Sequence, residues 1–274
     1  MNSIYNKHIN TWIDKITTPV EEYKICPFAS AARYVIEKGT KLELYKAIHR
    51  DISNLDLVVF IYEDTLTVKE AKEIMISLGR AGKMPCPTYN TPASLCVTGS
   101  RLRKVKGSTC HGCYAFKGNY VYPSVQKGLT KRFHAFDHPR FIEAMTFMIK
   151  RYSIKSGYFR WFDSGDLKDI SMLEKIVFIC QQTPEIDHWL PTREVKVVSD
   201  YLKIYKQFPD NLLVRLSAPM VDGEPIKSYK YTSTVNHKTK PVGHDCPARF
   251  QNNECKDCRA CWDRKVKNVS YHKH

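Results

Sequence analysis

Four cysteines near the end of the chain have the spacing of metal ligands. They follow the pattern Cys-x8-Cys-x2-Cys-x2-Cys and are Cys246, Cys255, Cys258 and Cys261. Two-residue spacing lets thiolates point at one centre while the chain turns around it, so that four of them complete a tetrahedral zinc site or a cluster with no open iron. Three cysteines at two-residue intervals favour a cubane iron–sulfur cluster, because zinc ligands more often come as two separated pairs.

A second group has only three cysteines, Cys96, Cys110 and Cys113, in the pattern Cys-x13-Cys-x2-Cys. A cubane cluster held by three thiolates leaves one iron free to bind a small molecule such as S-adenosylmethionine, whose sulfonium can then be cleaved reductively to a radical. Two other interpretations stay open. One is a zinc site, closed by His111, by His134 or by two C-terminal cysteines, and the other is a thiol redox pair.

Three more cysteines carry weaker signals. Cys86 stands between two prolines, which predicts an exposed extended segment and makes Cys86 an alternate ligand. Cys180 lies on the apolar face of a predicted helix and is expected in the core. Cys26 is left unassigned.

The elements that must position these groups alternate between strands and helices. Strands are predicted over 158–162, 187–192 and 212–217, and helices over 139–150, 169–182 and 195–207. Strand–helix–strand succession at these spacings indicates a parallel sheet with right-handed crossovers. We therefore predict an α/β fold, a partial or complete parallel β/α barrel with Cys-rich metal-binding segments.

Polar residues follow each of these strands. In parallel β/α folds the reactive groups lie just beyond the carboxyl ends of strands. We assign catalytic roles to Asp163, Asp166, Arg193 and Glu194, and cofactor binding to Ser164, Gly165, Thr192 and Ser217. Residues 163–166 are expected to contact the methionyl part of S-adenosylmethionine. The alternative is that all of these positions are ordinary strand-ending turns.

Two segments of different composition precede the alternating strands and helices. Residues 1–82 are predicted to form a small α/β N-terminal unit, with helices over 4–16 and 67–78 and a strand over 55–62. The Cys-rich β/α domain is predicted over 83–274. Its first part, residues 83–128, is rich in Pro and Gly, and we expect a long irregular stretch held together by metal.

The chain is strongly basic. Its 274 residues include 43 Lys and Arg against 28 Asp and Glu, a net charge of +15. Such a charge favours association with nucleic acid or a nucleotide. Arg101, Arg103, Lys104 and Lys106 form a basic loop between the cysteines of the second group, where they could bind phosphates or simply be solvated. Aromatic residues from Tyr114 onward could stack bases or pack over a cluster.

The compartment follows from what the sequence does not contain. No apolar run of about 18 residues appears, and the first residues lack a basic head followed by an apolar stretch. We expect a cytoplasmic protein without a membrane partner, in which thiols stay reduced and serve as metal ligands rather than disulfides.

Several longer motifs resemble the gene product 88 family of bacteriophage proteins. They are TPASLCVTG from Thr91, GSTCHGCYA from Gly107, RWFDSGD from Arg160, HWLPTRE from His188 and CKDCRACW from Cys255. The resemblance covers about residues 83–274 and implies a phage setting, with the host cytoplasm as compartment, more than an activity. The Cys-rich start and the alternating elements also look like a remote radical S-adenosylmethionine protein, although thirteen residues separate Cys96 from Cys110 where that superfamily has three.

Three functional hypotheses follow. The first is an iron–sulfur, radical S-adenosylmethionine-like enzyme acting on a nucleotide, nucleic acid or protein, with a reactive cluster in the three-cysteine group and an auxiliary one in the four-cysteine group. The second is a zinc-stabilised nucleic-acid-binding protein without catalysis. The third is a small electron-transfer or redox protein.

Overall fold

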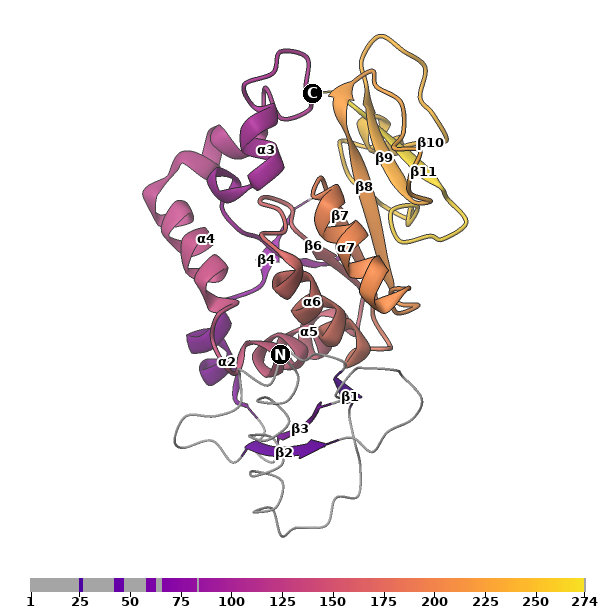
Figure 1. Ribbon diagram of the computed structural model, residues 1–274. Helices are drawn as coiled ribbons and strands as arrows, with labels where there is room; N and C mark the ends of the chain where they lie inside the picture. Colours follow the sequence, from indigo (N-terminus) through magenta and orange to yellow (C-terminus); the bar gives the residue numbers. More distant parts are fainter. Residues whose placement is uncertain (1–24, 27–41, 47–57, 63–65, 83, 274) are drawn as a thin grey trace. The chain divides into compact units, whose positions relative to one another are not determined.

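The computed structural model describes residues 25–26, 42–46, 58–62, 66–82 and 84–273 (Figure 1). The chain divides into two compact units, residues 1–69 and 70–274. The division into an N-terminal unit over 1–82 and a Cys-rich domain over 83–274, each folding on its own, stays a prediction. The helix predicted over 4–16 lies outside the described residues. No helix in the described ranges is long and apolar enough to cross a membrane.

The described part of the first unit is a small antiparallel sheet. Its strands are β1 (Ile25–Cys26), β2 (Leu42–Lys46) and β3 (Val58–Tyr62). They stand in the order β1-β3-β2, and β3 pairs antiparallel with both neighbours. The described part of the strand predicted over 55–62 is thus confirmed at Val58–Tyr62.

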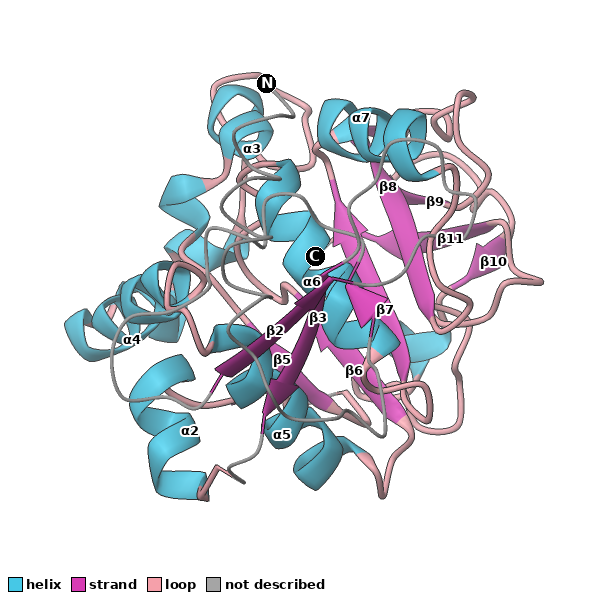
Figure 2. Ribbon diagram, turned by 60° about the horizontal axis from the view of Figure 1, so that its bottom comes forward, coloured by secondary structure: helices cyan, strands magenta, loops and turns pink. Residues whose placement is uncertain are grey.

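The second unit is built on an eight-stranded sheet in the order β10-β11-β9-β8-β7-β6-β5-β4 (Figures 1 and 2). Its strands are β4 (Gly79–Arg80), β5 (Pro87–Tyr89), β6 (Tyr158–Trp161), β7 (Asp187–Thr192), β8 (Leu212–Val221), β9 (Thr232–Asn236), β10 (His244–Asp245) and β11 (Asn268–His272). Only β4 runs antiparallel to its neighbour. The α/β class is confirmed, but the sheet stays open, with β10 and β4 at its edges, so a complete barrel is wrong.

Three helices connect the central strands as predicted. They are α5 (Phe141–Ser153), α6 (Ile170–Gln181) and α7 (Val195–Tyr205). Asp169 is the N-cap of α6, and its side chain accepts a hydrogen bond of 3.0 Å from the Met172 backbone nitrogen, so one otherwise unpaired donor of the first turn is satisfied. Cys180 is fully buried on this helix, which confirms its predicted place in the core.

The two faces of the sheet are covered by different parts of the chain. On one face, Trp161 packs on Tyr89, which in turn packs on Phe141 at the start of α5. On the other face, Tyr158 and Trp189 contact Trp262 from the C-terminal segment, with ring centroids 5.2 and 5.3 Å apart. Residues alternate between faces because successive side chains of a strand point to opposite sides. The sheet is therefore sandwiched between helices and the cysteine-rich tail.

Residues 84–136 contain more structure than their composition suggests. Between β5 and α5 lie η2 (Ala93–Leu95), α3 (Val97–Leu102), η3 (Tyr114–Phe116), η4 (Gly118–Val121) and α4 (Pro123–Ala135), and α2 (Val68–Met75) precedes β4. The helix α4 was not predicted. Pro123 occupies its first turn, where a missing N–H costs nothing, and the interior Gly128 weakens its helical signal.

Candidate metal centres

Cys96, Cys110 and Cys113 lie together on the segment that follows β5. Cys96 directly precedes α3, and Cys110 and Cys113 lie on the loop after this helix. A Cβ added to Gly99 would stand 3.7 Å from the Cys96 Sγ and 3.8 Å from the Cys110 Sγ, so both sulfurs face the same glycine. Cys113 interacts electrostatically with both thiols. We refer to these three residues as the cysteine triad.

The thiols of the triad are held in a desolvated place. Burial raises the pKa of Cys96 and Cys110 above the ordinary thiol range, and the Asp166 carboxylate adds to both shifts. The Arg193 guanidinium acts in the opposite direction on the pKa of Cys110. A bound cation supplies the positive charge that converts such thiols into thiolate ligands.

Two residues that follow β7 form hydrogen bonds with the residues on either side of the triad segment, one near Cys96 and one next to Cys110. Glu194 accepts hydrogen bonds from the Thr98 backbone nitrogen at 2.7 Å and from the Thr98 hydroxyl at 2.8 Å, at the start of α3. Arg193 donates from Nε and Nη2 to the Thr109 hydroxyl at 3.1 and 2.7 Å, next to Cys110. Arg193 and Glu194, two of the four residues predicted as catalytic, thus lie beside the triad and hold its segment in place.

Asp166 ties the ends of β6 and β7 together. Its carboxylate accepts hydrogen bonds from the Thr192 hydroxyl at 2.5 Å and from the backbone nitrogens of Leu167 and Arg193 at 2.8 and 2.9 Å. Burial raises the pKa of Asp166 to about 6, although these hydrogen bonds favour the charged form. Through these hydrogen bonds Asp166 positions the loops after β6 and β7.

The ends of β5 and β6 approach each other closely. The Thr91 nitrogen donates to the Ser164 carbonyl at 3.0 Å, and the Ser164 hydroxyl donates to the Thr91 carbonyl at 3.1 Å. Gly165 has a φ of +84°, and a Cβ there would stand 1.9 Å from the Thr91 Oγ1. Ser217, by contrast, accepts a hydrogen bond from Ser233 at 3.1 Å and faces β9. The cofactor-binding roles of these residues stay predictions.

Asp163 joins the triad segment to the sheet. Its carboxylate pairs with Arg160 at 2.9 Å and accepts a hydrogen bond from the Tyr120 hydroxyl at 2.9 Å. Its carbonyl accepts a hydrogen bond from the Tyr114 hydroxyl, and its nitrogen donates to the Asn90 side chain at 2.7 Å. The loop after Cys113 is therefore fixed to the end of β6.

The triad and the residues that support it lie within a region of the chain that matches a known protein family. The family model for gene product 88 matches residues 63–264. The chain belongs to the gene product 88 family. No curated protein and no solved structure matches the chain. The family resemblance predicted for residues 83–274 is confirmed over 83–264, and the match begins about twenty residues earlier, at residue 63.

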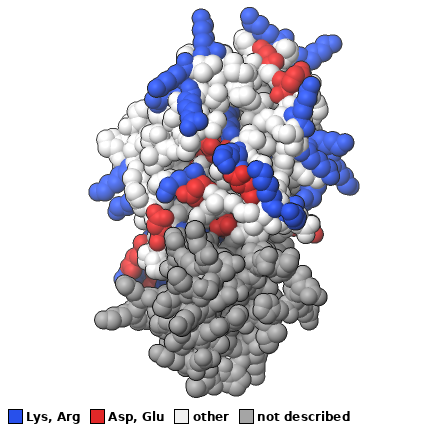
Figure 3. Space-filling view, viewed as in Figure 1, with Lys and Arg blue, Asp and Glu red and all other residues white. Residues whose placement is uncertain are grey.

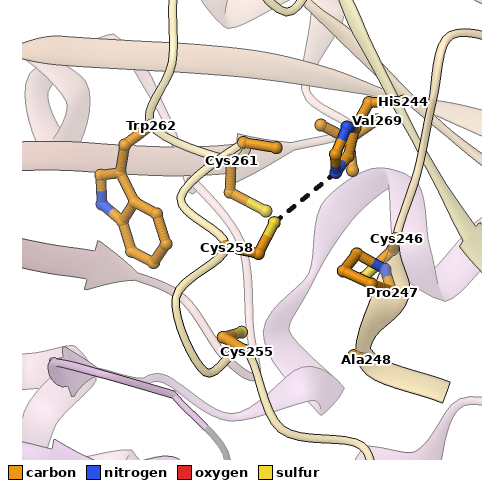
Figure 4. A pocket seen from close by; sticks show the side chains of 10 residues that line it. His244, Cys246, Pro247, Ala248, Cys255, Cys258, Cys261, Trp262 and Val269 are labelled. Carbon is orange, nitrogen blue, oxygen red and sulfur yellow. Dashed lines mark hydrogen bonds between the residues drawn. The ribbon is translucent and has the colours of Figure 1, made fainter. Parts of the chain in front are cut away.

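The four C-terminal cysteines of this gene product 88 protein line one small pocket together with His244 (Figure 4). The Cys258 Sγ lies 3.5 Å from the His244 Nε2, and the Cys261 Sγ lies 3.2 Å from the Tyr271 hydroxyl. Burial raises the pKa of Cys261 to about 12, and Cys246 and Cys255 contribute in the same direction. We call Cys246, Cys255, Cys258 and Cys261 the C-terminal cysteine group.

Cys86 adjoins the C-terminal cysteine group and not the triad. It is 6% exposed and belongs to the same core cluster as Cys261, which corrects its predicted exposure. Its thiol interacts electrostatically with Cys255 and Cys261, and the neighbouring Met84 Sδ lies 3.5 Å from the Cys255 Sγ. The two prolines beside Cys86 gave no sign of this burial, because the covering residues come from the far end of the chain.

Buried guanidinium groups surround the C-terminal cysteine group. Arg215 is fully buried and donates hydrogen bonds to the backbone carbonyls of Thr232, Ala260, Cys261, Asp263, Val266 and Lys267. Arg160 lies over the Trp189 ring at 4.7 Å and interacts with Cys261. Burial lowers the pKa of Arg215, and Tyr271, Cys261 and the Asp263 carboxylate act in the opposite direction, so these groups are its electrostatic neighbours.

The cysteine sulfur atoms of neither group lie at metal-bonding distances from a common centre. Within residues 66–82 and 84–273, no group of three or more His, Cys, Asp or Glu side chains has the geometry of a bound metal ion. The Cys-rich metal-binding segments are therefore not confirmed. Cys110 interacts electrostatically with Cys113 of the triad, whereas Cys246 and Cys255 interact with other cysteines of the C-terminal group. These contacts do not support the zinc ribbon considered above, in which Cys110 and Cys113 would share one zinc ion with two C-terminal cysteines.

Sequence reasoning missed the residues that support the two groups. Thr98 and Thr109 bind the residues that follow β7, Gly99 lies between two sulfurs, and Arg215 lies under the C-terminal loop. Thr98 and Gly99 lie within a motif quoted for the family resemblance, but their partners are about a hundred residues away. His111, one of the two histidines considered for zinc, is exposed and its Nδ1 lies 3.1 Å from the Arg103 carbonyl.

Proposed function

We propose that this gene product 88 protein is an iron–sulfur enzyme that binds S-adenosylmethionine at the cysteine triad and carries a second, closed metal centre at the C-terminal cysteine group. The observation that carries the proposal is that the Cys96 and Cys110 sulfurs face the same glycine, with Cys113 as their electrostatic neighbour, beside the polar loop after β7. Ligands and cofactors of parallel α/β folds bind at this end of the strands.

The residues of the triad suit a three-thiolate cluster. Gly99 leaves open the space that a side chain would fill beside the Cys96 and Cys110 sulfurs. When bound, a cluster with one open iron supplies the electron that cleaves the sulfonium of S-adenosylmethionine. Glu194 and Arg193 hold the two ends of the cysteine loop. Rigid support of this kind keeps ligand atoms within a fraction of an ångström of their working geometry.

The polar loops around the triad supply the groups that an amino acid substrate requires. We assign Ser164 and Gly165 at the end of β6, and Thr192 at the end of β7, to the face that receives the methionyl part of S-adenosylmethionine. Asp163 and Asp166 fix these loops through their hydrogen bonds, and the Asp166 carboxylate would be the negative charge available to the ammonium group, because Asp163 is paired with Arg160. Opposite charge at hydrogen-bonding distance orients such a group before the reaction.

The C-terminal cysteine group fits a closed metal centre. Four thiolates outweigh the two positive charges of a zinc ion and equally leave a cubane cluster negative. Arg215 and Arg160 supply buried positive charge beside Cys261. An anionic metal–thiolate centre would add to the Asp263 carboxylate as an opposite charge beside the buried Arg215, which lowers the cost of burying this cation.

A second candidate function has one observation in its favour. His244 lies 3.5 Å from Cys258, and a set of thiolates with one imidazole is a common zinc ligand set. Under this alternative the protein is a zinc-stabilised nucleic-acid-binding protein without catalysis, and both cysteine groups are structural.

Metal analysis with an absorption spectrum separates the two functions. Protein purified without oxygen is expected to be brown, to absorb near ~400 nm and to contain several irons per chain. With dithionite as the one-electron reductant, it is expected to cleave S-adenosylmethionine to methionine and a 5′-deoxyadenosyl radical, which becomes 5′-deoxyadenosine by taking a hydrogen atom from the substrate or from a thiol or buffer molecule in the assay. Colourless protein that carries only zinc, after expression with ample iron, would overturn the proposal.

Two variants then assign the iron to its sites. Cys110→Ala is expected to remove part of the iron and all cleavage of S-adenosylmethionine, while the remaining iron stays at the C-terminal group. Cys180→Ala is the matched control, because Cys180 is buried on α6 away from both groups. Equal loss of iron in both variants would mean that the thiols act only through the stability of the fold.

A further inference from the structure

We infer that the exposed surface of the segment that carries the triad binds single-stranded nucleic acid and presents it to the triad. We call this the basic face and define it by α3, the loop 103–113, η3, η4 and α4. The inference rests on the proposed function, because it names the substrate class of the same site. It is argued from charge, from exposed aromatic rings and from the position of both beside the cysteines.

The charge of this segment is one-sided. Residues 84–136 contain eight Lys and Arg residues and no Asp or Glu. Arg101, Lys104, Lys106 and Lys117 are exposed to solvent. Figure 3 shows blue side chains without red ones over α3 and the loop that follows it, at the upper left of the view. A surface with one sign of charge attracts polyanions and carries no internal ion pairs that would have to be broken first.

Exposed aromatic rings lie among these charges. Tyr114 is 52% exposed, Tyr122 is 56% exposed and Phe116 is 36% exposed. The Arg103 guanidinium lies over the Phe116 ring at 4.3 Å and covers one of its faces, so Tyr114 and Tyr122 are the more open rings. Unpaired bases stack on such rings, whereas the bases of a duplex are already stacked on one another. The combination of phosphate-binding charge and open rings therefore favours a single strand.

The basic loop is held in a fixed conformation next to the triad. The Arg103 nitrogen donates to the Gly99 carbonyl at 2.9 Å, and the Ser108 hydroxyl donates to the Leu102 carbonyl at 2.6 Å. The Thr109 nitrogen, next to Cys110, donates to the Pro219 carbonyl of β8 at 2.9 Å. A strand whose phosphates bind this loop would therefore pass close to the place where the triad holds its cofactor.

The first test is binding to fluorescein-labelled 20-nucleotide strands of oligo-dT and oligo-rU, measured by anisotropy on metal-loaded protein between 50 and 300 mM KCl. Affinity is expected to fall steeply with salt, with a slope of about −0.7 for each phosphate contacted. The two strands distinguish DNA from RNA, because only RNA offers a 2′-hydroxyl. Affinity that does not change with salt, or a duplex or an anionic lipid vesicle bound as tightly as both strands, would overturn the inference.

A charge-reversed variant locates the surface. Changing Arg101, Lys104, Lys106 and Lys117 to Glu is expected to weaken binding at 100 mM KCl at least tenfold and to lower the magnitude of the salt slope by about 3. The matched control changes Arg151, Lys155, Lys265 and Lys267 to Glu, four exposed residues away from the basic face. Equal weakening in the two variants would show that net charge, and not this surface, binds the strand.

Two further measurements keep the outcomes apart. Tyr122→Ala is expected to weaken binding about fivefold or more without changing the salt slope, since stacking contributes roughly 1–3 kcal/mol per base. An unchanged affinity would remove the stacking argument for a single strand. Binding is also measured on the Cys110→Ala protein. Binding without any S-adenosylmethionine cleavage by the wild type would support this inference and end the proposed function, whereas cleavage without binding would do the reverse.

Discussion

Gly99 is the residue whose small size matters most at the triad. A Cβ there would stand 2.9 Å from the Cys96 Cβ and close to two sulfurs, so one cysteine would have to shift. We expect Gly99→Ala to fold, because alanine favours a helix, yet to lose the iron of the triad and S-adenosylmethionine cleavage. Gly112→Ala is the control, because Gly112 lies between Cys110 and Cys113 and a Cβ there meets nothing within 4 Å. Iron analysis of both variants decides, and full iron in Gly99→Ala would contradict the assignment.

Arg215 shows how one side chain organises a whole loop. Its guanidinium is bonded to six backbone carbonyls, most of them in the segment around Cys261 and Val266. Arg215→Met removes these donors and leaves the carbonyls buried, so we expect the free energy of unfolding to fall by at least about 3 kcal/mol. We also expect metal to be lost from the C-terminal cysteine group, which is measured by metal analysis after dialysis.

The control for this variant is Arg264→Met. Arg264 also donates to backbone carbonyls, those of Pro209, Asp210 and Leu212, but it is exposed. Its loss should lower the free energy of unfolding by less than about 1.5 kcal/mol and leave the metal in place. If urea denaturation gave the same loss for both variants, the buried charge of Arg215 would have no special role.

At the scale of elements, the contact between the loops after β5 and β6 depends on a glycine. Gly165 has a positive φ and its hydrogen atoms face the Thr91 backbone. Gly157 also has a positive φ, but its missing side chain would meet nothing within 4 Å. Gly157→Ala is therefore expected to cost only the strain of the backbone, about 1–2 kcal/mol. Gly165→Ala adds a clash and should cost about 2 kcal/mol more. Equal losses on thermal denaturation would mean that the two loops separate freely.

The sequence predicted the elements whose periodicity is strong. Helices α5, α6 and α7 and strands β6, β7 and β8 have buried apolar residues at regular spacing, and all six were found close to their predicted bounds. Strands β9 and β11 were missed because their inward residues are polar. Thr232 bonds to Asn268 at 2.8 Å and Thr234 bonds to Ser270 at 3.1 Å, so hydrogen bonds take the place of apolar packing.

The candidate sites were predictable only in part. Closely spaced cysteines are visible in any sequence, and the polar residues after the strands followed from the parallel order of β6, β7 and β8. Cys86 could not be placed, because its neighbours Cys255 and Cys261 are far away in the chain. The same holds for Arg215, which looks like an ordinary strand residue until the C-terminal loop covers it.

At the scale of the whole molecule, the buried His188 predicts sensitivity to acid. Burial lowers the pKa of His188 to about 3, while an unfolded chain has a histidine pKa of about 6.5. The folded protein therefore excludes a proton that the unfolded chain binds below pH ~6.5. The stability from neutral His188 is present above that pH and is lost as the pH falls toward 3, at about 1.4 kcal/mol per unit.

Urea denaturation at pH 7 and pH 5 tests this expectation. The free energy of unfolding should fall by about 2 kcal/mol between them through His188 alone. His188→Gln keeps a polar partner for Thr183, whose hydroxyl lies 2.8 Å from the His188 Nε2, but cannot titrate. Its unfolding should therefore depend less on pH. The same pH dependence in both proteins would assign the acid sensitivity to other groups.

The tail that covers the second face of the sheet has a consequence for biosynthesis. Cys86 and Trp189 leave the ribosome long before Cys261 and Trp262, their partners in the same core cluster. During translation the apolar face around Trp189 is uncovered, and exposed surface of this kind invites association with other chains. Under the proposed function, the metal centre at the C-terminal cysteine group can be assembled only after Cys261 has been made. We therefore expect cells short of iron or zinc to accumulate this chain as an aggregation-prone precursor.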